Sequence, residues 1–232
     1  MAEQPIVRQI VKYTFFKLDP AWRRQPATDR AAQASEFVGA VRALEESVLL
    51  RTYSTVGMRG DTDFMLWVVH EDAREVSKAL ASLNQTVLAG YLTTPYSYLA
   101  QTRRSMYISR HEHPGSEGSR TRIVPKNEPY LFVYPFIKTR PWYALSQEER
   151  QNMMTQHIEF GHRFPKVTIN TSYSFGIDDQ EFVVAFESDN VSDFVDLVME
   201  LRHSKASMYT LRDTPAFTCM QLPIEDILAD LG

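Results

Sequence analysis

A shortage of cysteine and of long apolar runs limits what this chain can be. Cys219 is the single cysteine among 232 residues, so no internal disulfide can form, and no CxxC pair or His/Cys cluster indicates zinc. No apolar run approaches the ~20 residues of a membrane-spanning helix. The N-terminus lacks the apolar core of a secretory signal, although a precursor whose signal was removed fits the same sequence. We therefore expect a cytoplasmic protein without a membrane span.

An excess of basic charge is also absent. The chain has 25 Lys and Arg against 29 Asp and Glu, a net charge of −4. Because phosphate backbones are bound by basic surfaces, we expect no nucleic-acid partner. Hydrophobic residues make up 44% of the chain, which is ordinary for a soluble globular protein. The length suits one large domain or two halves of roughly 100 residues each.

The chain repeats itself with a spacing of about 120 residues. Each copy begins with a strand-like stretch that is followed by a helix. A Tyr-Ser motif and a polar turn come next, and they are followed by a second apolar stretch and a second helix. A Thr-Pro pair closes each copy. The matching segments are YTFFKLDPAW (13–22) and YPFIKTRPWY (134–143), YSTVG (53–57) and YSFG (173–176), FMLWVVHED (64–72) and FVVAFESDN (182–190), and TTPYSYL (93–99) and DTPAFTCM (213–220).

This repeat predicts the fold class. Each half has the order strand, helix, strand, strand, helix, strand, which is typical of a ferredoxin-like α+β unit. Each sheet would leave one face bare, so we expect two tandem ferredoxin-like halves packed as a pseudo-twofold dimeric α/β barrel. The expected boundaries are an N-terminal half at 1–101, a connecting loop at 102–129 and a C-terminal half at 130–232.

The connecting loop is polar and basic and contains Pro, Gly and Ser. It can be a solvated linker. Loops of this length inside compact domains are uncommon and often functional, so Arg120 and Arg122 remain candidate binding residues.

A helix is predicted from Ser146 to about residue 163, since Ser146 and Glu149 form a capping box. His157 lies on its apolar face. A histidine in such a place is more often a packed residue than a ligand, but the equivalent helix at 27–44 has no histidine. One histidine is too few for a bare metal ion, whereas one axial histidine suffices for haem. Without a CxxCH motif, any haem would be held non-covalently.

Several motifs in order resemble the chlorite dismutase superfamily, and most closely its coproheme decarboxylases. They are YPFIK, WYALSQEER, MMTQHIEFG, YSFGIDDQEFVVAFESD, DFVDLVMELR and ASMYTLRDTPAFT. The resemblance spans nearly the whole chain and is strongest from Tyr130 to Met220. It implies the barrel described above, assembly into a homo-oligomer (often a pentamer), and haem b or iron-coproporphyrin III in the C-terminal half. It also implies that His157 is the axial ligand of the haem iron.

The resemblance also separates subclasses. Chlorite-splitting members carry a distal arginine about thirteen residues after the histidine, where this chain has Asn170, or Ile169 if a gap is placed between. They also place an acidic residue near the ligand, where this chain has Ala206. Both departures disfavour chlorite chemistry, and many decarboxylases have a glutamine at the distal position. We keep Asn170 as the candidate distal contact of the cofactor.

The decarboxylase pattern implies catalytic roles for Tyr134 and Lys138. It also implies that Arg120, Arg202 and Ser207 hold the porphyrin carboxylates, although Lys138 and Arg202 taken alone are residue types that usually lie at surfaces. The expected reaction uses hydrogen peroxide to convert two propionates of iron-coproporphyrin III into vinyl groups, giving haem b. The alternatives are a chlorite dismutase or peroxidase-like haem enzyme and a non-catalytic haem-binding module.

Overall fold

A computed structural model describes residues 7–107 and 122–232, so Arg120 lies outside the described residues. The chain divides into two compact units. Gln9–Leu99 together with Phe217–Gly232 form the N-terminal unit, and Ala100–Ala216 lie in the C-terminal unit. The predicted halves follow the sequence repeat, whereas these units place the last strand and helix with the N-terminal unit. No helix in the described ranges is long and apolar enough to cross a membrane.

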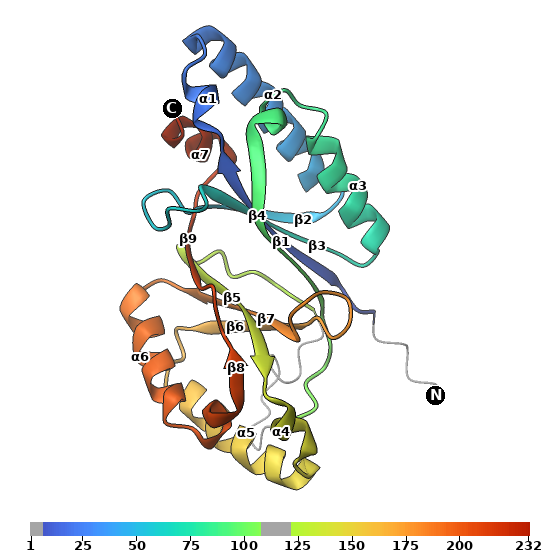
Figure 1. Cartoon of the computed structure of the whole chain (residues 1–232), viewed down its shortest axis with the longest axis vertical. Coiled ribbons are helices and arrows are strands. Elements are labelled where there is room, and N and C mark those ends of the chain that lie inside the picture. The colour runs from blue at the N-terminus through green and yellow to red at the C-terminus, as the bar shows by residue number, and fades with distance from the viewer. Residues whose placement is uncertain (1–6, 108–121) are drawn as a thin grey trace. The chain divides into compact units, whose positions relative to one another are not determined.

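The N-terminal unit contains an antiparallel sheet whose strands follow the order β4-β1-β3-β2-β9. Helices α2 and α3 pack together beside this sheet (Figure 1). The elements are β1 (Ile10–Leu18), α1 (Pro20–Arg23), α2 (Ala27–Glu45), β2 (Leu49–Ser54), β3 (Phe64–His70), α3 (Ala73–Leu83), η1 (Leu88–Tyr91), β4 (Leu92–Gln101), β9 (Phe217–Gln221) and α7 (Ile224–Asp230).

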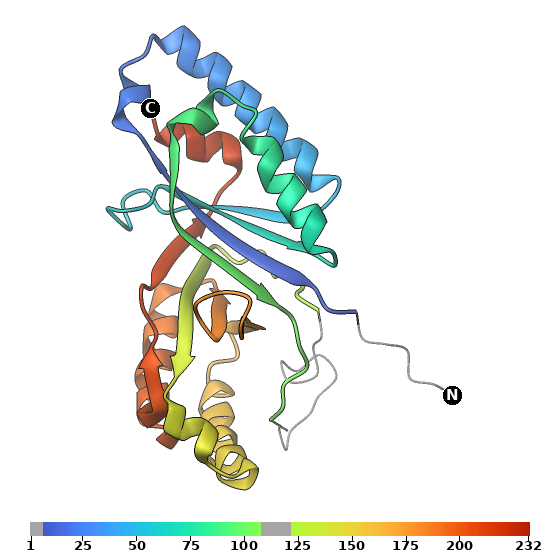
Figure 2. The same ribbon diagram turned by 45° about the vertical axis from the view of Figure 1, so that its right-hand side comes forward.

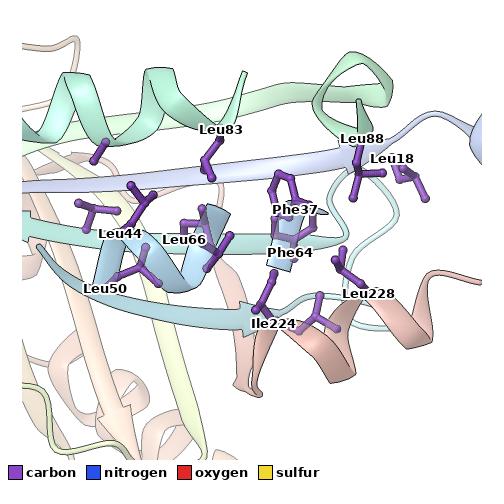
Figure 3. Packing of buried hydrophobic residues seen from close by; sticks show 14 of the residues in the cluster. Leu18, Phe37, Leu44, Leu50, Phe64, Leu66, Leu83, Leu88, Ile224 and Leu228 are labelled. Carbon is purple, nitrogen blue, oxygen red and sulfur yellow. The ribbon is translucent and has the colours of Figure 1, made fainter. Parts of the chain in front are cut away.

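A continuous apolar core lies between these helices and the sheet (Figure 3). Phe64 of β3 is fully buried and stacks on Phe16, with the ring centres 4.8 Å apart. Phe37 brings α2 against the same ring, at 6.1 Å. Ile224 and Leu228 of α7 close the core from the C-terminal end of the chain. Burial of these side chains from four separate segments holds the unit together.

The C-terminal unit repeats the order of elements. They are β5 (Tyr130–Lys138), α4 (Arg140–Ala144), α5 (Gln147–Gly161), β6 (Thr168–Tyr173), β7 (Phe182–Ser188), α6 (Val191–Arg202), η3 (Lys205–Tyr209) and β8 (Thr210–Arg212). Antiparallel pairing gives the strand order β6-β7-β5-β8. This corresponds to β2-β3-β1-β4 in the first unit. The predicted α+β class and the repeated order of strands and helices are therefore confirmed.

The two faces of the C-terminal sheet differ in burial. Residues paired directly across neighbouring strands point to the same face, so Tyr134, Val184 and Thr171 form one row across the sheet. The adjacent row of Phe132, Phe186 and Ile169 packs against α6 and shows that this face points toward the helices.

On this helix-facing side the row of Tyr134 is only half-buried, and so is the next row of Phe136, Phe182 and Tyr173. The opposite side is buried throughout its central rows, as Val133, Ala185 and Asn170 illustrate. The face that carries the helices is thus the less covered one.

The core of the N-terminal unit gives a stability prediction. Replacing Phe64 with Ala removes a fully buried ring, so urea unfolding should show a loss of about 3–5 kcal/mol in the free energy of unfolding. Val87→Ala is the control, because Val87 is 53% exposed and should change stability by less than about 0.5 kcal/mol. Equal effects of the two substitutions would contradict this assignment of the core.

Candidate functional site

Helix α5 carries His157 and begins at a capped N-terminus. The backbone N–H of Glu149 donates to Ser146 Oγ at 3.2 Å, and the Ser146 N–H donates to the Glu149 carboxylate at 2.9 Å, which confirms the predicted capping box. The helix ends at Gly161, slightly before the predicted end. None of its residues is fully buried, whereas α2 buries Phe37, Val41 and Leu44. Its main contacts are with α6 and η3 (Figure 2).

His157 is half-buried and points toward the segment that joins α6 to η3. Its Nδ1 lies 3.4 Å from Ser204 Oγ, and that hydroxyl donates to the Leu201 carbonyl at 2.7 Å. Since the hydroxyl hydrogen is used there, Ser204 Oγ accepts from Nδ1–H, and Nε2 keeps its lone pair. Burial, aided by the nearby charge of Lys138, lowers the pKa of His157 to about 4. The imidazole is therefore neutral near pH 7 and able to ligate a metal through Nε2.

Lys138 is buried at the end of β5. Its Nζ donates to the Ala206 carbonyl at 2.7 Å and lies 4.6 Å from the ring centre of Trp142. Burial lowers the pKa of Lys138 to about 8, while the charge of Glu181 opposes this shift. Trp142 is buried and covers this ammonium group.

Glu181 was missed by the sequence reasoning, although the repeat could have found it. Glu181 Oε2 accepts from the Lys138 backbone N–H at 2.8 Å and from the Tyr143 hydroxyl at 2.5 Å. In the first half Asp63 occupies the aligned position, and it accepts from the backbone N–H of Leu18 at 2.8 Å.

The lysine aligned with Lys138 behaves differently. Lys17 Nζ forms an ion pair with Asp63 at 2.8 Å, whereas Lys138 Nζ turns to the Ala206 carbonyl. The carboxylate at the strand end is retained in both halves, and only in the second does the ammonium group face η3.

Tyr134 occupies the middle of the helix-facing surface and stacks on Phe186, with the ring centres 5.8 Å apart. Burial raises the pKa of Tyr134 well above its usual range, and the charge of Asp213 adds to the effect while Arg202 opposes it. The phenol is therefore protonated. Asp213, another residue that the sequence reasoning missed, forms an ion pair with Arg202.

The segment from Leu201 to Ser207 brings the predicted residues together. Ser204 contacts His157, and Ala206 contacts Lys138. The Ser207 hydroxyl lies 2.8 Å from the Arg202 carbonyl and 2.7 Å from the Ser204 carbonyl, so it braces the turn. Sequence reasoning missed Ser204, since its contact with α5 joins residues far apart in the chain.

Asn170 is not brought to this surface. Its side chain is buried on the opposite face of the sheet, where Nδ2 donates to Glu187 Oε1 at 2.9 Å. Glu187 Oε2 accepts from the backbone N–H groups of Lys126 and Asn127 at 2.7 and 3.1 Å, and burial raises the pKa of Glu187. Of the two candidate distal positions, Ile169 is the one that faces the helices.

The donor set fits an iron porphyrin better than a bare ion. Among the described residues no group of three or more His, Cys, Asp or Glu could hold a metal ion, so His157 would be a single protein ligand. A porphyrin supplies four further nitrogens. The half-buried rows on the helix-facing side of the sheet offer apolar area for a flat ring, and Lys138 and Arg202 offer cations for its carboxylates.

Comparisons with known proteins show which family this chain belongs to. The sequence profile described as chlorite dismutase matches residues 30–222 of this chain. A coproheme decarboxylase from Mycolicibacterium smegmatis is 28% identical over 231 residues, which cover 95% of this chain and 94% of that protein.

Solved structures share the fold. A variant of the chlorite dismutase from Candidatus Nitrospira defluvii has a TM-score of 0.86, and the enzyme from that organism in complex with imidazole has one of 0.85. Each is 24% identical to this chain, and each comparison covers 96% of this chain and 94% of the other. The likeness supports the α+β architecture over almost the whole length.

The pKa of His157 gives a prediction for the porphyrin-free protein. Its ring should titrate near pH 4, and ¹⁵N NMR of the imidazole should show the neutral Nδ1–H form at pH 6. Because the unfolded chain binds this proton near pH 6.5, unfolding free energy should fall as pH drops from 6.5 toward 4. His157→Gln should remove both the signal and its share of this slope. A ring protonated at pH 6 would contradict the prediction.

Proposed function

Because the chain belongs to the chlorite dismutase family, we propose that it is a haem-dependent enzyme whose C-terminal unit decarboxylates iron-coproporphyrin III. Hydrogen peroxide serves as the oxidant, and two propionates become vinyl groups to give haem b. For each group, one propionate, one peroxide and one proton yield a vinyl group, carbon dioxide and two waters. The near full-length similarity to a coproheme decarboxylase supports this choice of substrate.

The observation that carries the proposal is the convergence of Tyr134, Lys138 and His157. Tyr134 lies on the half-buried helix-facing surface, and Lys138 and His157 are both held by the segment Ser204–Ala206. A redox-capable phenol, a cation for a carboxylate and a neutral imidazole are thus gathered on one side of one sheet. A non-catalytic haem carrier would have no need of the phenol.

His157 Nε2 is proposed to bind the iron, with Ser204 orienting the ring through Nδ1. A neutral hydroxyl acceptor gives the imidazole less imidazolate character than a carboxylate would. When bound, the iron porphyrin supplies the peroxide-dependent oxidising chemistry. The remaining steps depend on the side chains around it.

Tyr134 is proposed to lose its hydroxyl hydrogen as an electron and a proton together, and then to take a hydrogen atom from the propionate Cβ. Its raised pKa keeps that hydrogen in place beforehand. Lys138, with a pKa of about 8, can hold a carboxylate and exchange a proton near neutral pH. Arg202 is proposed to hold a further propionate, whereas the hydroxyl of Ser207, the other residue expected to do so, donates its hydrogen to backbone carbonyls of its own turn.

Residues on β6 favour decarboxylation over chlorite splitting. Its helix-facing side chains are Ile169, Thr171 and Tyr173, and none is cationic. Strand β6 thus has no side chain with the positive charge that the resemblance assigns to the distal arginine, and neutral peroxide, unlike an anionic oxidant, does not require one there. We further infer that the two halves are ferredoxin-like, and the strand order shared by the two units supports this inference. We also infer that the halves pack as a pseudo-twofold barrel and that the chain assembles into a homo-oligomer.

Tyr134→Phe should bind iron-coproporphyrin III but release no carbon dioxide from it, because a phenyl ring has no hydroxyl hydrogen to give up. The test adds hydrogen peroxide stepwise to the loaded protein and follows the porphyrin mass. The wild type should lose two carboxyl groups, and Tyr130→Phe should behave like the wild type because Tyr130 lies on the same strand and face. Full activity in Tyr134→Phe would exclude the proposed role.

His157→Ala should lose the Soret spectrum of a histidine-ligated iron porphyrin, measured by absorbance after reconstitution with iron-coproporphyrin III. His162→Ala is the matched control, since His162 is exposed at the C-terminal cap of the same helix and should leave the spectrum unchanged. An unchanged Soret band in His157→Ala would mean that another residue ligates the iron or that none does.

A further inference from the structure

A small, open hollow lies beside β6, the first strand in the order of the C-terminal sheet. Two arginines line it: Arg103, just after β4, and Arg122, on the segment that leads into β5. Thr102 and Thr171 add hydroxyl groups, and none of the described residues that line the hollow is acidic. Guanidinium and hydroxyl groups together form a donor set suited to an anion.

The hollow adjoins the surface that carries Tyr134. Ile169 and Thr171 line it and belong to the helix-facing rows of the sheet, and Asn170 between them lines it from the opposite face. The guanidinium carbon of Arg103 lies 6.0 Å from the ring centre of Tyr173, the next helix-facing residue on β6. Arg103 therefore reaches over the same face of the sheet as Tyr134.

The charge of Arg103 is not neutralised by any carboxylate among residues 7–107 and 122–232, because no ion pair joins it to one. Arg163 and Arg202, by contrast, pair with Glu200 and Asp213. The hollow lies beside β6, and Lys138 lies at the end of β5. Strands β5 and β6 are separated by β7, which places these two strands roughly 10 Å apart.

We propose that Arg103 and Arg122 bind a carboxylate of the bound porphyrin, and that this carboxylate is a propionate that the product retains. The inference rests on the proposed function. The reacting propionates must lie near Tyr134 and Lys138 on β5, so a carboxylate beside β6 is beyond their reach. Substrate and product then use these arginines equally, and only the groups on and beside β5 distinguish the two.

The test measures porphyrin affinity, independently of turnover. Porphyrin-free wild type, Arg103→Gln and Arg122→Gln are each titrated with iron-coproporphyrin III and with haem b, and the Soret absorbance gives the Kd. Each substitution should raise both Kd values about fivefold, the upper end for a single exposed ion pair. Arg104→Gln is the control, because Arg104 is an exposed neighbour that does not line the hollow.

The outcomes separate this site from the proposed function. If the wild type binds both porphyrins and the Arg103 and Arg122 variants bind them with the same Kd, the proposed site is wrong and the proposed function is unaffected. Wild type that binds neither porphyrin would overturn both. A loss confined to iron-coproporphyrin III would mean that the carboxylate is a reacting one, and an equal loss in Arg104→Gln would mean a general charge effect. Either result would refute the proposal.

Discussion

Two hydrogen bonds to one short segment position the candidate site. Ser204 accepts from the imidazole of His157, and the Ala206 carbonyl accepts from the ammonium group of Lys138. The segment is placed by α6, whose Phe194 stacks on Phe132 with ring centres 3.9 Å apart. Packing of α6 on the sheet therefore determines where a helix residue and a strand residue, far apart in the chain, meet.

The two repeated units use aligned residues differently. In the first half the aligned lysine and carboxylate pair with each other, and α2 buries three side chains in the core. In the second half the carboxylate still caps the strand end, but Lys138 is redirected and α5 buries none. The same topology thus serves stability in one unit and leaves polar and half-buried groups available in the other.

Much of the fold followed from the sequence because the repeat fixed the order of elements and the capping box fixed the start of α5. The residue at the distal position could not be predicted from the sequence. Side chains alternate between the two faces of a strand, so a shift of one residue in the alignment exchanges Ile169 for Asn170. Contacts between segments far apart in the chain could not be predicted from the sequence either, and the contacts of Ser204 and Asp213 are examples. Glu181 was within reach, since Asp63 precedes the aligned strand in the first half.

The lack of buried side chains on α5 has a consequence for folding. A helix in water gains most of its stability from tertiary packing, so α5 depends on its cap and on contacts with α6 and η3. A ligand inserted against this helix would act as the missing part of its core. Binding free energy would then appear as slower amide hydrogen exchange in α5, which links the occupancy of the site to the local stability of one helix.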